Sequence, residues 1–322
     1  MLDRILVPLD GSALAECVLP HVVAVSAPFR SEVTLLRVLE PPPSAEGPTA
    51  VSVLDWQLRR TEAQAYLDSV ATRLTGQGLT VHTQLAEGDP AERIVALARS
   101  WNVDLLILSS HGRGGLNRFN LSSVAFKIVF RAYVSVMVVR AFQPLSGDLA
   151  SVHYGQIVLP MDCSQRAEHV LSVATRIARH HQARVLLLHV VHRPEMPRRR
   201  PLTPEETALA DQVAALNREG ASLCLEDVKS QLKSEQVTAE LEIFASEGNP
   251  AEILQDRVER SGSDLTVLSA HGASGGSRWP YGGLTVHFIA YGTTPLLILQ
   301  DLKPEQVMPD KAEILATEFK GR

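Results

Sequence analysis

Cysteine, aromatic residues and long apolar runs are all scarce in this chain of 322 residues. The three cysteines, Cys17, Cys163 and Cys224, are odd in number and form no CxxC pair. We therefore expect neither a disulfide framework nor a structural zinc site. Cys163 is expected to be a small structural residue, and the alternative is a low-pKa thiol at the start of a helix after Asp162.

A membrane span and an export signal are also missing from the pattern. No apolar stretch approaches the ~20 residues that a transmembrane helix needs. The strand-like run at the N-terminus, MLDRILVPLD, does not have the layout of a signal peptide. We expect a cytoplasmic protein with no membrane partner.

An excess of positive charge is absent too, because the formal net charge is −5 at pH 7. The basic cluster Arg198–Arg200 stands among prolines and is expected to be a solvated loop, so we expect no nucleic-acid partner. The 11 histidines form no HxxxH or HExxH arrangement, and we assign no metal site. Walker A and GxGxxG loops are missing, which removes the two commonest phosphate-binding fingerprints.

The chain instead contains one pattern twice. RILVPLDGSALAECVLP (4–20) recurs as QIVLPMDCSQRAEHVLS (156–172), and EGDPAERIVALA (87–98) recurs as EGNPAEILQDRV (247–258). The offset grows from 152 to 160 residues across a proline-rich middle segment, as a surface connection allows. This repeat predicts two domains, 1–150 and 151–301, followed by a charged tail, 302–322, with at most a short helix.

Each copy alternates short apolar runs with helical segments. Runs such as RILVPL and VDLLILS are too short for helices and do not alternate in polarity, which is typical of strands buried on both faces of a parallel sheet. Asp89 and Asn249 each precede Pro-Ala-Glu, a typical helix start. We therefore predict an α/β fold of two tandem doubly wound, Rossmann-like domains, each with a five-stranded parallel sheet flanked by helices.

Ligands of such sheets bind beyond the carboxyl ends of the strands, where the strand order reverses. Asp10 should therefore face the turn that contains Ser109 and Gly112. Gly112 would allow a close backbone approach, and Ser122 and Ser123 would cap the next helix, whose N-terminus favours an anion such as a phosphate. The alternative is that the glycines of this stretch only make a tight exit from a strand.

His111 and His271 occupy equivalent turns. Neither has a carboxylate or nucleophile at a recognisable spacing, so hydrogen bonds that fix the turn are favoured over general-base catalysis. We assign no catalytic residue.

Three motifs of the first copy, each with a counterpart in the same order in the second, resemble the universal stress protein family in its tandem form. They are DGS after the first strand, EGxPAExI before the third helix and LxLSSHGRGGLxR after the fourth strand, and the match covers roughly residues 1–300. Nucleotide-binding members carry G-x2-G-x9-G-[ST] around the ATP phosphates and ribose. They also carry an aspartate after the first strand and a valine that holds adenine through its backbone.

The resemblance implies a nucleotide site in each half. The positions in the first half are Asp10, Val38, Ser109, Gly112, Ser122 and Ser123, and those in the second are Asp162, Val190, Gly272, Gly282 and Gly283. Both halves depart from the motif, because Ser109 and Ser269 replace its first glycine, Ser122 replaces the third, and Gly283 replaces the hydroxyl residue.

The resemblance therefore implies a non-catalytic, stress-response regulator that binds ATP or another adenine nucleotide (AMP or ADP), which Mg²⁺ could accompany. The serine pair should favour the N-terminal pocket. The alternative is a nucleotide-independent interaction module with vestigial pockets, associating through the last strands, VSVMVV and PLLILQ. Pairing of these strands would make either a homodimer or an intramolecular pseudo-dimer. The resemblance also implies a sheet topology similar to that of adenine-nucleotide α-hydrolases. A third class, an enzyme related to these α-hydrolases or to nucleotidyl transferases, lacks its signature motifs here.

Overall fold

The computed structural model describes residues 1–41, 53–115, 121–141, 148–193, 203–246, 248–272 and 279–302. The predicted basic loop at Arg198–Arg200 and the predicted tail beyond Leu302 lie outside the described residues. Within the described part, no helix is both long and apolar enough to span a bilayer.

The first half follows the predicted alternation of strands and helices. Its elements are β1 (Arg4–Pro8), α1 (Ala13–Glu16), α2 (Leu19–Phe29), β2 (Glu32–Leu39), α3 (Val53–Thr75), β3 (Thr80–Glu87), α4 (Pro90–Ser100), β4 (Leu105–Ser109), α5 (Ser123–Ala132) and β5 (Ser135–Val139). The helix after β1 is split into two pieces, and Pro20 stands in the first turn of the second piece, where a missing N–H is harmless.

The second half repeats the order from β6 onward. Its elements are β6 (Gln156–Pro160), α6 (Gln165–His181), β7 (Arg184–His192), α7 (Pro204–Ser234), β8 (Ala239–Ser246), α8 (Pro250–Arg260), β9 (Leu265–Ser269), α9 (Gly283–Tyr291) and β10 (Leu296–Leu299). The expected caps are present, because the side chains of Asp89 and Asn249 accept hydrogen bonds from the backbone of α4 and α8.

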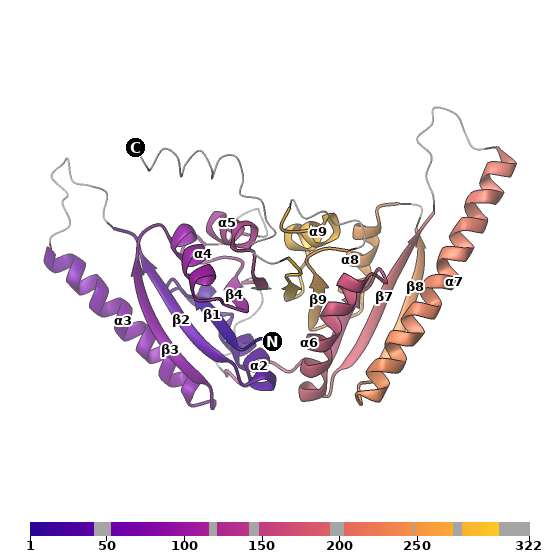
Figure 1. Cartoon of the computed structure of the whole chain (residues 1–322). Helices are drawn as coiled ribbons and strands as arrows, with labels where there is room; N and C mark the ends of the chain where they lie inside the picture. The colour runs from indigo at the N-terminus through magenta and orange to yellow at the C-terminus, as the bar shows by residue number, and fades with distance from the viewer. Residues whose placement is uncertain are drawn as a thin grey trace.

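The strands form one sheet of ten, in the order β3-β2-β1-β4-β5-β10-β9-β6-β7-β8. All pairs within a half are parallel, and the halves meet where β5 pairs antiparallel with β10. The predicted five-stranded parallel sheets are confirmed, and their last strands join them into one intramolecular pseudo-dimer. Figure 1 shows α3 with β3 and α7 with β8 at the two outer flanks.

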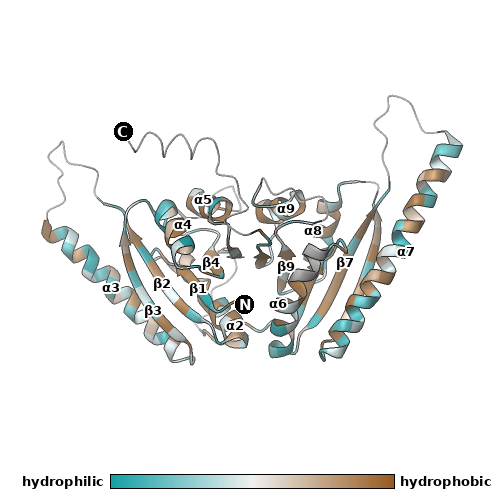
Figure 2. Cartoon of the chain, viewed as in Figure 1, coloured by the Kyte–Doolittle hydropathy of each residue, from teal (hydrophilic) through white to brown (hydrophobic). Residues whose placement is uncertain are grey.

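Helices cover both faces of this sheet. One apolar core lies between the sheet and helices α2, α3, α6 and α7, and the other lies between the sheet and α4, α5, α8 and α9. The strands are the most continuously apolar elements in Figure 2, as expected for strands covered on both faces.

Polar contacts also link the halves. His21 of α2 bonds through Nδ1 to the hydroxyl of Tyr154, 2.8 Å away, and both side chains are buried. Tyr281 donates its hydroxyl to the carbonyl of Val129 in α5 at 2.9 Å. The buried guanidinium of Arg140, just after β5, donates to the last-turn carbonyl of Phe288 in α9 at 2.9 Å.

The expectation for the cysteines is wrong, because Cys163 and Cys224 form a disulfide. Cys163 lies in the loop after β6 and Cys224 lies in α7, 61 positions later. A pair so far apart has no local sequence motif from which it could be predicted. Cys163 also does not open a helix, because it lies in the left-handed region (φ 60°), two residues before α6. Cys17 is a free, buried thiol.

Candidate functional site

An open cleft of about 760 Å³ lies at the carboxyl ends of β1, β2 and β4 in the first half. This is the edge at which doubly wound sheets bind ligands, and the volume falls in the range of small-molecule sites. The N-terminal parts of α3, α4 and α5 complete its walls. The lining includes all the first-half positions predicted from the sequence: Asp10, Val38, Ser109, Gly112, Ser122 and Ser123.

Asp10 joins the loops that follow β1 and β4. Its Oδ1 accepts the N–H of Ser12 at 2.9 Å, and its Oδ2 accepts the N–H of Arg113 at 2.6 Å. A Cβ atom on Gly112 would collide with that second oxygen. Asp10 thus faces the Ser109–Gly112 turn as predicted, and Gly112 is required there for close approach to a carboxylate of the same chain.

The second half repeats this junction. Asp162 Oδ1 accepts the N–H of Ser164 at 3.0 Å, and a Cβ on Gly272 would collide with Asp162 Oδ2. The two copies therefore share the same aspartate–glycine contact across the switch point, as their sequence repeat predicts.

Val38 offers its backbone to the cleft. Along β2 the carbonyl of Leu36 accepts the N–H of Leu9, whereas the carbonyl of Leu39 accepts the N–H of Gly88 after β3. Because backbone groups of a parallel strand point alternately to its two neighbours, those of Val38 are directed past the end of β1. Val190 of β7 has the same position, since the carbonyl of Leu188 two residues earlier accepts from Met161.

The three serines of the first-half site differ in what their hydroxyls do. Ser109 Oγ lies 2.9 Å from the carbonyl of Leu14 and 2.7 Å from that of His111, so it fixes the turn. Ser122 is the N-cap of α5, and its Oγ accepts the N–H of Ala125 at 3.2 Å. Ser123 begins the helix and is exposed beside the cleft, where its hydroxyl and the N-terminus of α5 can meet an anion.

The corresponding helix start in the second half lacks hydroxyl groups. Gly282 is the N-cap of α9 without a side-chain cap, and Gly283 begins the helix. Both have negative or extended backbone angles that any residue adopts, and a Cβ on either would meet no atom closer than 3.7 Å. Neither glycine is therefore demanded by sterics.

The two turn histidines are fixed by hydrogen bonds, the role predicted for them. His111 is buried, and its Nδ1 lies 3.1 Å from Ser110 Oγ. His271 bonds through Nδ1 to Asp301 at 2.7 Å and through Nε2 to the carbonyl of Trp279 at 2.7 Å. Sequence spacing did not reveal Asp301 as a partner. Among the described residues, no group of three or more histidines, cysteines and carboxylates is placed to hold a metal ion.

Arg37 is a cleft residue that the sequence analysis missed. Its guanidinium lies over the Tyr66 ring, 5.2 Å from the ring centroid, and within 3.0 Å of where a Cβ on Gly11 would stand. Burial lowers the pKa of Arg37, and the nearby Arg113 lowers it further. Arg59 and Arg113 also line the cleft, as do the carboxylates Glu40 and Glu62. The signal in the sequence is a cation inside the apolar run of β2, directly before Val38.

The two crossover helices align through their buried positions. Ala63, Leu67, Val70 and Leu74 of α3 correspond to Ala221, Leu225, Val228 and Leu232 of α7. In this alignment Tyr66 corresponds to Cys224 and Arg59 to Asn217, and the strand repeat pairs Arg37 with His189. The second half therefore replaces these cleft arginines by His189 and Asn217, and Ala273 stands at the sequence position of Arg113.

Comparison with known proteins agrees with this architecture. The family model described as "Universal stress protein family" matches residues 1–140 and 153–300. The chain is 31% identical over 138 residues to universal stress protein MJ0531 of Methanocaldococcus jannaschii, a match that covers 42% of this chain and 81% of the relative. Universal stress protein Sll1388 of Synechocystis is 28% identical over 149 residues, covering 42% of this chain and 97% of the relative.

Solved structures of similar length share the fold across the whole chain. A putative universal stress protein from Pseudomonas aeruginosa aligns with a TM-score of 0.65 at 17% identity, covering 100% of this chain and 98% of that one. A universal stress protein from Archaeoglobus fulgidus aligns with a TM-score of 0.63 at 17% identity, covering 92% and 97%. Together with the two family matches, one in each half, these similarities show that the chain belongs to the universal stress protein family and carries its domain twice.

Proposed function

We propose that the chain is a regulatory protein that binds ATP or another adenine nucleotide in the first-half cleft and catalyses no reaction of its own. The observation that carries the proposal is the convergence of three kinds of group on one open cleft. These are the outward-directed backbone of Val38, the N-terminus of α5 with the exposed Ser123, and the guanidinium groups of Arg37, Arg59 and Arg113.

Each group suits a different part of a nucleotide. A backbone N–H and C=O side by side can pair with the edge of an adenine ring, as Val38 offers. A helix N-terminus and arginine side chains stabilise phosphate oxygens, which carry charge and accept several hydrogen bonds. Mg²⁺ would then enter with the phosphates rather than in a site of its own.

A nucleotide in this position would act as a conformational signal. It would span the loops after β1, β2 and β4, and Asp10 already links the loop after β1 to the loop after β4 through the N–H of Arg113. Ligand binding to loops that carry few other contacts orders them, and a partner protein can distinguish the ordered from the open edge of the sheet. No nucleophile or general base is needed for such a role.

We propose that the first-half pocket is preferred over the second. The second half keeps Asp162, Val190 and Gly272 but has glycines at the helix start and lacks the cleft arginines. A hydroxyl donor to a charged acceptor contributes about 1.5–3 kcal/mol, which corresponds to roughly tenfold or more in affinity. Occupancy of the second pocket should therefore be weaker or absent.

Two measurements on the intact chain test the proposal. Protein purified without added nucleotide is denatured, and the supernatant is analysed by chromatography for ATP, ADP and AMP. Calorimetric titration with ATP should then give one dominant site per chain that Asp10→Ala weakens. Two equal sites would refute the pocket preference, and the absence of both bound nucleotide and a titration signal would favour the nucleotide-independent interaction module.

A further inference from the structure

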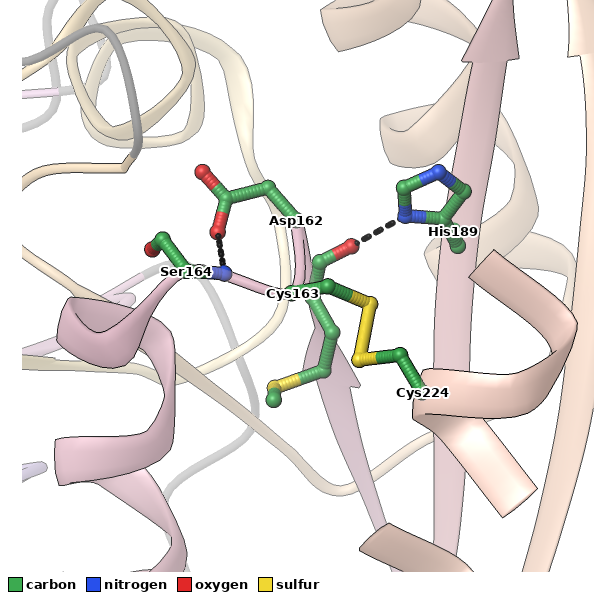
Figure 3. The surroundings of a disulfide bond; sticks show 6 residues. Asp162, Cys163, Ser164, His189 and Cys224 are labelled. Carbon is green, nitrogen blue, oxygen red and sulfur yellow. Dashed lines mark hydrogen bonds between the residues drawn. A yellow bond between two sulfur atoms is a disulfide. The ribbon is translucent and has the colours of Figure 1, made fainter. Parts of the chain in front are cut away.

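We propose that Cys163 and Cys224 form a reversible redox site, at which a dithiol reductant opens and a peroxide or disulfide oxidant closes a covalent bond between the carboxyl edge of the sheet and helix α7. The proposal concerns thiol chemistry and goes beyond nucleotide binding. It does not require that either cleft is occupied. Figure 3 shows the bond between the loop that carries Asp162 and the helix that carries Cys224.

The corresponding junction of the first half is held without a covalent bond. Gly11 corresponds to Cys163, and Tyr66 corresponds to Cys224. There the guanidinium of Arg37 lies between them, against Gly11 and over the Tyr66 ring. Both halves therefore tie the loop after their first strand to the crossover helix, and only the second half does so with chemistry that can be switched.

The backbone conformation at Cys163 is one that cysteine adopts only under strain. Its φ of 60° lies in the left-handed region, which Gly11 occupies in the first half with a φ of 79°. A residue with a Cβ is strained in this conformation, whereas glycine is not. A benefit that glycine lacks must therefore offset this strain, and that benefit is the covalent bond of the Cys163 sulfur to Cys224.

The pair is accessible to reagents, in contrast to the third cysteine. Cys163 and Cys224 are both half-buried, so a thiol can reach the bond without unfolding of the chain. Cys17 is buried, its Sγ contacts Ser109 Oγ at 3.3 Å, and burial raises its pKa to about 11. A thiol with so high a pKa is a poor nucleophile, so Cys17 does not compete in exchange reactions.

The bond acts on a short, heavily connected loop. Two hydrogen bonds hold Met161 to β7. The N–H of Met161 donates to the carbonyl of Leu188 at 2.8 Å, and the carbonyl of Met161 lies 2.7 Å from His189 Nδ1. Asp162 contacts Gly272, and Cys163 adds the link to α7. Opening the disulfide removes the connection to α7 and leaves those to the sheet.

The part of α7 before Cys224 has few buried side chains, and the ion pair of Asp211 with Arg193 at 2.7 Å also ties it to the chain after β7. Among the buried side chains of α7, only Ala210 lies more than one turn before Cys224, and the others (Ala221, Leu225, Val228 and Leu232) lie near or after it. Leu209, Leu216 and Leu223 are exposed on the same stretch. Figure 1 shows this end of α7 projecting beyond the sheet. Reduction should therefore loosen the N-terminal turns of α7 before the rest of the domain.

The chemistry balances as ordinary thiol–disulfide exchange. A thiolate of the reductant attacks one sulfur, and the mixed disulfide that forms is resolved by the second thiol of the reductant. Two electrons and two protons pass to Cys163 and Cys224, and the reductant leaves as a disulfide. In the reverse direction hydrogen peroxide takes the two electrons and two protons and is released as two water molecules.

Alkylation of the intact, folded chain with iodoacetamide, followed by peptide mapping, tests the site. We expect no labelling of Cys163 or Cys224 in oxidised protein. After native treatment with dithiothreitol both should be labelled at least about tenfold faster than Cys17, and hydrogen peroxide should restore protection. Hydrogen exchange should rise on reduction in residues 204–224, and Cys17→Ala should respond as the wild type does.

A glycine variant supplies the matched control. Cys163→Gly places at this position the glycine that the first half has there, without the Arg37–Tyr66 contact, and removes backbone strain. The domain should therefore fold, show fast exchange in residues 204–224 and ignore reductant. The proposal is overturned if the two cysteines stay alkylatable after oxidant, or if the bond opens only on unfolding. It is also overturned if exchange in α7 is equal in the oxidised, reduced and Cys163→Gly proteins.

Discussion

The carboxylate of Asp10 fills the space that a side chain on Gly112 would need. Two loops that are about a hundred residues apart are thereby closed against each other at the floor of the first-half cleft. A substitution of Gly112 should therefore change the cleft floor and leave both apolar cores intact.

Gly112→Ala should push Asp10 off its bonds to the Ser12 and Arg113 amides and distort the cleft floor. We expect at least about a tenfold loss of ATP affinity in calorimetric titrations, equivalent to about 1.4 kcal/mol, with an unchanged far-ultraviolet circular dichroism spectrum. Gly114→Ala in the same loop is the control, because a Cβ there meets no atom within 4 Å. Equal affinities for the two variants would contradict the importance of the contact.

The two serines at the start of α5 should separate stability from binding. Ser122 caps the helix, so Ser122→Ala should lower the free energy of unfolding by about 1 kcal/mol in urea titrations. Ser123 is exposed beside the cleft, so Ser123→Ala should leave stability unchanged and weaken ATP binding roughly tenfold. A single binding site insensitive to Ser123→Ala would disprove the assignment of α5 to the phosphates.

Arg37 should strengthen the binding of ligands that carry negatively charged phosphates. Arg37→Met removes a cation from a partly desolvated wall, and we expect about a tenfold loss of ATP affinity together with a weaker dependence of affinity on salt. Adenosine, which has no phosphate, should bind wild type and variant alike. Arg60→Met is the matched control, because Arg60 pairs with Glu87 at 3.0 Å on the exposed side of α3. Loss of adenosine binding in Arg37→Met would indicate a distorted cleft instead.

The contact between the halves should weaken in mild acid. Burial lowers the pKa of His21 to about 4, whereas an unfolded histidine titrates near 6.5. The unfolded chain therefore binds more protons between these values, and stability present above pH 6.5 is lost as the pH falls toward 4. We expect a loss of up to about 3 kcal/mol.

Urea titrations at pH 7.5, 6 and 5 measure this dependence. His21→Asn keeps a polar group near Tyr154 but does not titrate, so its stability curve should be flatter. His181 contributes in the same direction, because burial lowers its pKa as well. The exposed His82 gives a neutral control in His82→Gln. A wild-type stability that is constant from pH 7.5 to 5 would rule out this role for His21.

The hydroxyl of Tyr281 should contribute more to the free energy of unfolding than that of the exposed Tyr291. Tyr281→Phe removes the hydrogen bond to the Val129 carbonyl across the junction of the halves, at an expected cost of about 1 kcal/mol. Tyr291→Phe changes a side chain that is 61% exposed and should shift stability by less than about 0.5 kcal/mol. Thermal unfolding of both variants distinguishes the two cases, and equal shifts would show that the cross-half bond is dispensable.

Sequence reasoning succeeded where the position of a residue depends on the order of the strands. Asp10 meets Gly112, and Asp162 meets Gly272, because loops at the carboxyl ends of adjacent parallel strands must share one edge. The helix caps Asp89 and Asn249 were also readable, since a cap acts within its own few residues.

Contacts that depend on the rotation of a helix escaped prediction. The Cys163–Cys224 bond, the Arg37–Tyr66 contact and the Tyr281–Val129 bond each join a loop or strand to a helix whose rotation a single sequence does not specify. Pairing through the apolar last strands was predicted, but the sequence did not decide between a homodimer and the antiparallel pairing within one chain that the structure has.

The antiparallel pairing of β5 with β10 has a consequence for how the protein can evolve. Identical subunits that meet across a symmetry axis must accept every substitution at two places at once. Here one gene encodes the two sides of the junction as separate segments, and every chain contains one copy of each half. One copy could therefore retain arginines around its cleft while the other acquired a cysteine pair, a division of labour closed to any assembly of identical chains.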